Sequence, residues 1–209
     1  MRAGFGLAEA SVDRTDVRIR DWSLASEGTS LSARVAAEGF GFALQFTPTS
    51  TPMLNGDQGY SQKGPAATSA SYYYSLPGLS VAGTVSRAGV ATPVTGRAWL
   101  DHEWSSAPLD AESVGWDWVG LNLDDGGALM AIQIRDAMGA AFWSAGTLRR
   151  ADGRIVRLQP DQMRFATNRL WRSPRTGTEY PVERTLSLRL PSGESRWLLK
   201  PLFDDQELD

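Results

Sequence analysis

The sequence has one histidine, and the residues around it are the best suited to acid–base chemistry in the chain. His102 lies in the stretch TGRAWLDHEWSS, between Asp101 and Glu103 and close to Trp99 and Trp104. An imidazole titrates near neutral pH, and a paired carboxylate favours the charged form that donates a proton. This stretch is therefore our first candidate for the centre of a site.

The elements that hold these side chains are predicted to be strands. Successive residues of a strand point to opposite faces, so His102 and Trp104 share one face while Asp101 and Glu103 share the other. We expect the face with His102 to be buried. An imidazole among apolar groups then needs a carboxylate from elsewhere in the chain.

The segment GWDWVGLNL supplies a candidate partner. Trp116 and Trp118 lie on one predicted face, whereas Asp117 lies on the other with three aliphatic residues, Val119, Leu121 and Leu123. A buried carboxylate is costly unless it is paired with a cation. We therefore predict that Asp117 pairs with His102 and that the pair provides a proton donor in a dry cavity with aromatic walls.

Two other interpretations of these residues stay open. His102 can be a core histidine whose hydrogen bonds are satisfied, with the tryptophans serving only to pack. Asp101 and Glu103 can form a carboxylate pair of the glycosidase type, although no sugar-binding context accompanies them. The chain lacks the G-x-S-x-G nucleophile motif, the P-loop and the glycine pattern of dinucleotide-binding sites.

No metal or cofactor is predicted. The chain has no cysteine, so zinc sites built on thiolates and disulfides are excluded. Acidic residues gather at residues 123–126 and again at Asp204, Asp205 and Glu207, but neither group follows the spaced loop of calcium sites.

Composition also excludes several classes of partner. The 209 residues include 24 acidic and 21 basic side chains, a formal net charge of −3. No basic stripe is present, so no nucleic-acid partner is expected. No apolar run approaches the roughly 20 residues that span a bilayer, and the first residues lack the apolar segment of a signal peptide.

Most segments alternate with period two, which predicts an all-β fold. Alternation is clearest at residues 40–46, and further strands are expected at residues 17–24 and 31–37. Turn signals at residues 87–89 and 124–127 predict hairpins. Many short antiparallel strands joined by tight turns are typical of an up-and-down meander closed into a barrel or sandwich.

Several blocks, taken in order, resemble one known family. They are NGDQGYSQKGP, SYYYSLPGLSVAGTV, VTGRAWLDHEWSS, GWDWVGLNLDDGGALM, W-x-S-P-x-T-G-x-x-Y-P and the ending PLFDDQEL. Together they are similar to the lipocalin-like family that includes the carotenoid 1,2-hydratases and the AttH-type secreted proteins. The resemblance covers essentially the whole chain.

The resemblance implies two lipocalin-like antiparallel barrels, of which the first is incomplete. Residues 1–67 correspond to the remainder of the N-terminal barrel with a linker rich in proline, glycine and serine, and residues 68–209 to the C-terminal barrel. The family's upstream E-W-W-Y-x-T-G block and downstream Y-W-E-G block are absent from this sequence. We therefore expect the chain to be a fragment of a longer protein.

The blocks are more similar to the AttH branch, which implies a bacterial protein that binds a small hydrophobic ligand, a lipid or an isoprenoid. That branch also implies a periplasmic or secreted location and a link to an ABC-type transporter. Its members are in some cases described as predicted secreted hydrolases, so a hydrolase activity is a further expectation. An inactive structural fragment is a further alternative.

The hydratase branch implies a different activity, the acid-catalysed addition of water to a carbon–carbon double bond. Asp117, Asp101 or Glu103 would then act with His102. The aromatic side chains would stabilise the carbocation and bind the ligand; these are Trp99, Trp104, Trp116, Trp118 and Tyr73.

Overall fold

A computed structural model describes residues 6–107, 109–191 and 193–208. Within these residues the secondary structure consists of β-strands in antiparallel sheets and one short 3₁₀ helix, so the prediction of an all-β chain is confirmed. The elements are β1 (Ala8–Ala10), β2 (Asp16–Ile19), β3 (Trp22–Glu27), β4 (Ser30–Ala37), β5 (Phe40–Thr47), β6 (Met53–Leu54), β7 (Tyr60–Gln62), β8 (Ala70–Arg87), β9 (Val90–Ala107), β10 (Gly115–Asn122), β11 (Ala128–Arg135), β12 (Ala141–Arg149), β13 (Ile155–Leu158), the 3₁₀ helix η1 (Pro160–Gln162), β14 (Met163–Arg172), β15 (Glu179–Leu190) and β16 (Gly193–Leu199).

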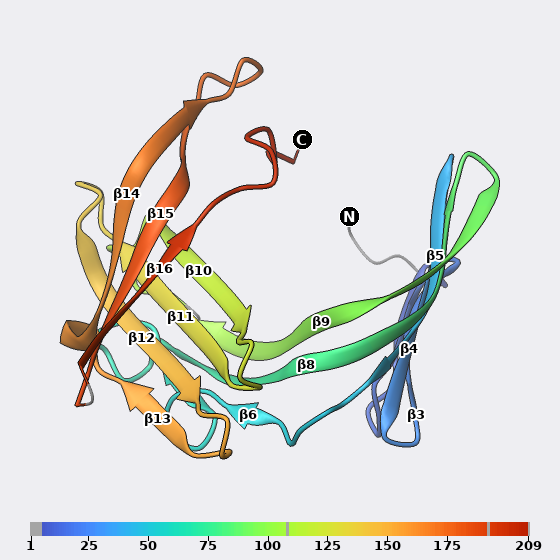
Figure 1. Ribbon diagram of the computed structural model, residues 1–209, viewed down its shortest axis with the longest axis horizontal. Coiled ribbons are helices and arrows are strands. Elements are labelled where there is room, and N and C mark those ends of the chain that lie inside the picture. Colours follow the sequence, from blue (N-terminus) through green and yellow to red (C-terminus); the bar gives the residue numbers. More distant parts are fainter. Residues whose placement is uncertain (1–5, 108, 192, 209) are drawn as a thin grey trace. The chain divides into compact units, whose positions relative to one another are not determined.

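The strands of the described residues form three sheets (Figure 1). The first contains β1 to β9, with β5, β6, β7 and β9 all paired to β8. The second follows the order β10-β11-β12-β13 and the third the order β14-β15-β16. Neighbours in these two sheets are consecutive in the chain, which is the meander that the tight turns predict.

The chain divides into two compact units. Unit 1 comprises residues 1–53 and 75–102, and unit 2 comprises residues 54–74 and 103–209. The long strands β8 and β9, 18 residues each, contribute residues to both units. The predicted boundary after residue 67 lies inside unit 2, so the compact units divide the chain differently; the division into two barrel domains stays a prediction.

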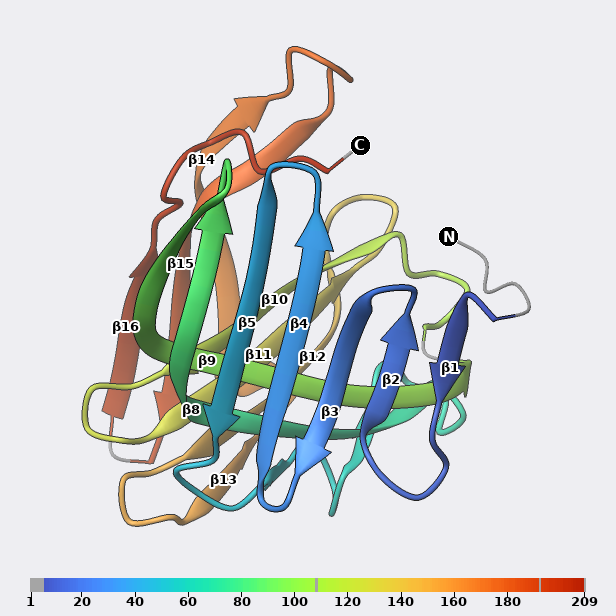
Figure 2. The same cartoon turned by 90° about the vertical axis from the view of Figure 1, so that its right-hand side faces the viewer.

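Unit 1 is built from a meander in which β2 to β5 and β8 lie side by side (Figure 2). The alternating apolar residues predicted at 40–46 form β5, and the predicted turn at residues 87–89 joins β8 to β9. The strand predicted over residues 17–24 is wrong, because the chain turns at Arg20 and Asp21 between β2 and β3. Arg20 adopts a positive φ of 53° there, and no glycine marks the turn.

Unit 2 contains an apolar core between the second and third sheets. Its buried members come from β11, β12, β13, β14 and β15, namely Leu129, Ala131, Leu148, Leu158, Met163, Phe165, Leu186 and Leu188. β11 is buried from residue 128 to residue 134 on both faces. The segment before β8 lies against the second sheet, since the Trp143 indole donates to the Gln62 carbonyl at 3.0 Å and Arg157 pairs with Asp57 at 2.7 Å.

Candidate functional site

Three of the sequence blocks meet at an ion pair around the buried side chain of Lys63 in unit 2. Lys63, which follows β7, is only 3% exposed, and its Nζ lies 2.9 Å from Oε1 of Glu103 on β9. Lys63 also donates to Ser61 Oγ at 2.9 Å and lies over the Tyr73 ring, 4.7 Å from the centroid. A buried ammonium needs such compensation, because desolvation otherwise penalises its charge. We call Lys63, Glu103, Ser61, Ser71 and Tyr73 the lysine cluster.

Local backbone geometry brings the lysine cluster together. A tight turn at residues 57–60 precedes β7, with Gly59 at φ 93°. The turn returns the chain so that β7 pairs with β8 and Ser61 lies opposite Ser71. Ser71 and Tyr73 share the buried face of β8, and Ser71 donates a hydrogen bond to the Glu103 carboxylate. Gly56 is required nearby, because an added Cβ would lie 2.3 Å from the Tyr60 carbonyl oxygen.

The prediction that the His102 face of β9 is buried is wrong. His102 is exposed, and Trp104 on the same face is 51% exposed and stacks on Tyr72 at 5.6 Å. The opposite face carries the carboxylates: Glu103 binds Lys63 and Ser71, while Asp101 accepts hydrogen bonds from Ser75 at 2.6 Å and Trp99 at 2.9 Å. The acidic side chains face the buried serines of β8, which the sequence pattern did not reveal.

Asp117 has the buried position that we predicted, but the predicted partner is wrong. Its carboxylate accepts two hydrogen bonds from Arg184, at 2.6 and 3.0 Å, and lies 3.6 Å from Arg135. Both side chains of the Asp117–Arg184 pair are 11% exposed. Two guanidinium nitrogens thus bind both carboxylate oxygens in a two-pronged ion pair.

The five predicted ligand-binding residues lie in different surroundings. Tyr73 is 2% exposed and accepts a hydrogen bond from the Trp118 indole at 3.1 Å. Trp116 and Trp104 are more than half exposed, and half-buried Trp99 belongs to unit 1. The structure therefore does not bring these residues together around one enclosed cavity, and their ligand-binding role stays a prediction.

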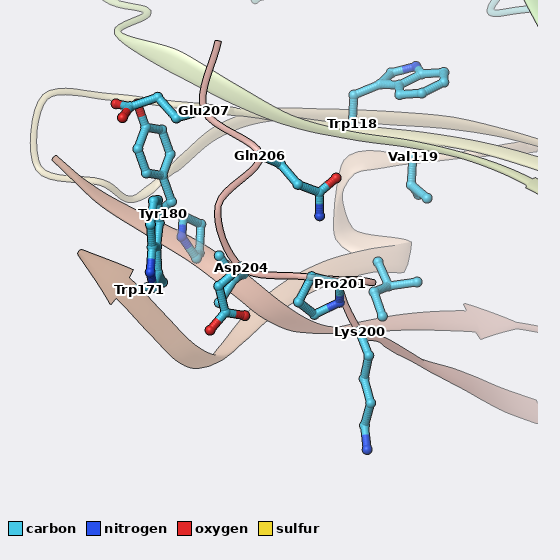
Figure 3. Close-up of a pocket in the computed structure, with 12 residues that line it drawn as sticks. Trp118, Val119, Trp171, Tyr180, Lys200, Pro201, Asp204, Gln206 and Glu207 are labelled. Carbon is cyan, nitrogen blue, oxygen red and sulfur yellow. The ribbon is translucent and has the colours of Figure 1, made fainter. Parts of the chain in front are cut away.

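A pocket of about 500 Å³ lies within unit 2 (Figure 3). Trp118 is the predicted residue that contributes to its lining; Trp118 and Val119 extend to opposite sides of β10. The other lining residues come from β14, β15, β16 and the segment after β16; they are Trp171, Tyr180, Pro181, Val182, Leu199, Lys200, Pro201, Asp204, Gln206 and Glu207. The sequence interpretation missed them, although Trp171, Tyr180 and the last segment belong to two blocks that carry the family resemblance.

Residues 200–208, which we call the C-terminal segment, are held to the hairpin of β14 and β15. Arg169 binds both oxygens of Asp204 at 2.6 and 2.7 Å, and Arg175 binds Asp205 at 2.8 Å. These carboxylates, considered in sequence as calcium ligands, are thus paired with arginines. Among the described residues, no group of three histidine, cysteine or acidic side chains is arranged to hold a metal ion.

Glu207 is the most strongly perturbed acid of the C-terminal segment. Its side chain is 6% exposed and accepts hydrogen bonds from Ser173 at 2.5 Å, Thr176 at 2.7 Å and Tyr180 at 2.7 Å. These hydrogen bonds, in that order of effect, lower the pKa of Glu207 from 4.5 to about 2. The same contact with Glu207 raises the pKa of Tyr180.

Comparison with known proteins adds a family and a fold. A family model described as AttH-like matches residues 1–209. The crystal structure of an AttH protein from Nitrosomonas europaea is 48% identical, with a TM-score of 0.92 over 100% of this chain and 64% of that one. Kievitone hydratase from Nectria haematococca is 20% identical, with a TM-score of 0.75 over 95% of this chain and 61% of its own. No curated protein sequence matches.

These relatives confirm the lipocalin-like fold class predicted from sequence. The chain spans less than two thirds of the length of either solved structure. Among the described residues, no helix is long and apolar enough to cross a membrane.

Proposed function

The chain belongs to the AttH-like family, and on that basis we propose that it binds a hydrophobic ligand with a polar end, a lipid or an isoprenoid, in the pocket of unit 2. The pocket itself carries the proposal. Its volume of about 500 Å³ lies within the range of roughly 300–1,000 Å³ that small-molecule sites occupy. Aromatic and aliphatic side chains contact an apolar body, while Lys200 and Gln206 offer polar groups.

The proposal is tested with a neutral probe whose fluorescence rises in apolar sites, N-phenyl-1-naphthylamine. We expect Val182→Trp, which fills the pocket, to weaken probe binding by at least about tenfold, because the occupied volume excludes the probe. Trp171→Ala, which removes one wall, should weaken it less. Circular dichroism checks that each variant keeps its β-structure.

Trp104→Ala is the matched control, because Trp104 is exposed and lies outside the pocket lining. Its probe affinity should equal that of the unmodified chain. Unchanged binding in both pocket variants would disprove the pocket as the site. Loss of binding in Trp104→Ala alone would instead favour the exposed aromatic face of β9.

A second candidate function is hydration of a carbon–carbon double bond, which the lysine cluster favours because it holds Glu103 between a cation and a hydroxyl donor. In hydration one carbon accepts a proton from an acid, the other bonds to the oxygen of water, and the remaining proton passes to a base. Glu103, Asp101 and His102 are the candidates for proton transfer. Asp117 is the least suited, since both of its oxygens bind Arg184.

The enzymatic alternative predicts a product that is heavier than its substrate by one water. With lycopene as the probe, mass spectrometry should detect this product, and Glu103→Gln or His102→Ala should abolish it while lycopene affinity stays within about tenfold. Glu112→Gln is the control, since Glu112 lies outside the cluster. Absence of the hydrated product from the unmodified chain, despite measurable lycopene binding, would leave binding as the function.

A further inference from the structure

The C-terminal segment, residues 200–208, forms one side of the pocket in unit 2. It supplies five of the twelve lining residues, namely Lys200, Pro201, Asp204, Gln206 and Glu207. In Figure 3, the Gln206 side chain extends from the segment toward the side of the pocket that holds Trp118 and Val119. A ligand in the pocket would therefore lie against this segment as well as against the strands.

The backbone of the segment is not part of a sheet. β16 ends at Leu199, and residues 200–208 have no strand or helix conformation. Among the described residues, the one backbone–backbone hydrogen bond of the segment joins Gln206 to Asp204 within it. A stretch whose backbone is not tied to neighbouring strands opens at a lower free-energy cost than the sheets beside it.

Apolar burial does not hold the segment in place either. Its large apolar side chains are exposed: Leu202 by 97%, Phe203 by 62% and Leu208 by 95%. Removal of apolar surface from water is the main force that fixes an element against its neighbours. These three side chains lose little of that stabilisation when the segment moves away, so its attachment depends on polar contacts.

Two of the polar contacts are ion pairs open to water. In the pair of Arg169 with Asp204 the side chains are 44% and 37% exposed, and in the pair of Arg175 with Asp205 they are 41% and 49% exposed. Ion pairs with this exposure contribute little to stability, because water solvates both partners well when they separate. They orient the segment but hold it weakly.

The buried contact is that of Glu207. Its carboxylate accepts hydrogen bonds from Ser173, Thr176 and Tyr180 at the turn end of the β14–β15 hairpin, and Arg175 donates to its backbone carbonyl at 2.8 Å. Hydrogen bonds to a carboxylate are stronger than those between neutral groups. The attachment of the whole segment is therefore concentrated at one residue.

A pocket wall that is attached mainly through one carboxylate can be released without breaking any strand pairing. We propose that the C-terminal segment is the gate of the pocket, and that the ligand enters and leaves when Glu207 separates from the hairpin. This inference rests on the proposed ligand-binding function. A gate controls the rates of both entry and exit, whereas a fixed wall that loses a ligand contact changes mainly the rate of exit.

The test measures binding kinetics of N-phenyl-1-naphthylamine by stopped-flow fluorescence. In Glu207→Gln we expect the association and dissociation rate constants both to rise by at least about threefold, because loss of the charge-assisted hydrogen bonds increases the open fraction. The equilibrium affinity should stay within about threefold, since both rates change together. Glu179→Gln, which removes a carboxylate of the same hairpin outside the pocket lining, is the control and should keep both rates.

A covalent bridge tests the opposite direction. The chain has no cysteine, so the double variant Thr176→Cys with Glu207→Cys carries the only two thiols, at side chains that are in contact in the structure. The short reagent 1,3-dichloroacetone joins the thiols, and mass spectrometry verifies the bridge. We expect bridging to lower both rate constants by at least about tenfold relative to the same variant before bridging, because the segment can no longer separate from the hairpin.

The outcomes separate this inference from the function on which it rests. Equal rates before and after bridging would overturn the gate while leaving ligand binding intact. A faster dissociation in Glu207→Gln with unchanged association would also overturn it, since the segment would then be a fixed wall. Failure of the unmodified chain to bind the probe would instead overturn the proposed function. If the double variant does not fold, the comparison of Glu207→Gln with Glu179→Gln decides by itself.

Discussion

Lys63 shows how burial decides the energetics of a single residue. Its side chain is 3% exposed, whereas that of its partner Glu103 is 39% exposed. The charged group that remains when its partner is removed is therefore hydrated to a different extent in the two cases. Glu103 without Lys63 can be hydrated, but Lys63 without Glu103 keeps a charge away from water.

We predict that Glu103→Gln destabilises unit 2 more than Lys63→Met does. The expected costs are about 2–4 kcal/mol for Glu103→Gln and about 1–2 kcal/mol for Lys63→Met, because only the first leaves a buried charge without its anion. Urea unfolding at pH 7 measures both. The double variant should cost less than the sum, and a larger cost for Lys63→Met would contradict this assignment of the buried charge.

Glu207 makes the attachment of the C-terminal segment dependent on pH. Its pKa falls from 4.5 to about 2 in the folded protein, so its contribution to stability is complete above pH 4.5 and disappears as the pH falls toward 2. We expect the segment to detach across this range. Trp171 stacks on Tyr180, a hydrogen-bond donor to Glu207, so its fluorescence reports the change.

Glu207→Gln should weaken the attachment already at pH 7 and flatten the fluorescence change between pH 4.5 and 2. Glu179→Gln removes a nearby carboxylate that accepts none of these hydrogen bonds and should retain the full pH dependence. An acid transition of unchanged size in Glu207→Gln would show that another group is responsible.

At the level of elements, Gly83 within β8 is a position where backbone geometry excludes other residues. It has φ +154° and lies opposite Leu44 of β5. A Cβ at this position would lie 2.2 Å from the Ala43 carbonyl oxygen and 2.9 Å from the Leu44 Cα. The two strands approach so closely that the backbone itself must move to admit a side chain.

We predict that Gly83→Ala destabilises unit 1. The strained backbone alone costs about 1–3 kcal/mol, and the clash of the added Cβ with β5 increases this cost. Thermal unfolding followed by circular dichroism measures the change. Gly96→Ala in β9 is the control, because an added Cβ there has no atom within 4 Å and should cost little. Similar melting of the two variants would contradict the role of close approach.

The elements also show what local patterns reveal. Alternating side chains predicted β5, and turn residues predicted the hairpins at residues 87–89 and 124–127, where Ala88, Gly89 and Gly126 have positive φ. The turn between β2 and β3 was missed because Arg20 adopts its positive φ without the glycine that usually signals it. Turn prediction succeeds where residue type and backbone conformation agree.

At the level of the molecule, the buried apolar cluster belongs wholly to unit 2. Leu186 and Leu188 at its centre are 0% exposed, while the buried Leu31 belongs to unit 1. Deleting buried methyl groups destabilises the unit that contains them, through lost transfer free energy and the cavity that remains.

We predict that Leu186→Ala costs unit 2 about 2–5 kcal/mol and leaves unit 1 unchanged. Hydrogen exchange measured by mass spectrometry distinguishes the units: exchange should accelerate in β11 and remain the same in β4. Leu31→Ala should give the reverse pattern. Equal acceleration in both units after either substitution would show that they unfold as one.

The sequence by itself determined the fold class, the strands with clear alternation, and the residues that share a strand face, because each of these depends on neighbours along the chain. It also indicated correctly that a carboxylate at position 117 needs a cation. Only the tertiary structure decided which face of β9 contacts the buried serines of β8 and which cation is used: Arg184, 67 residues away, binds Asp117, and Lys63 binds Glu103. Alternation divides a strand into two faces, but the packing of distant segments determines which face becomes the interior.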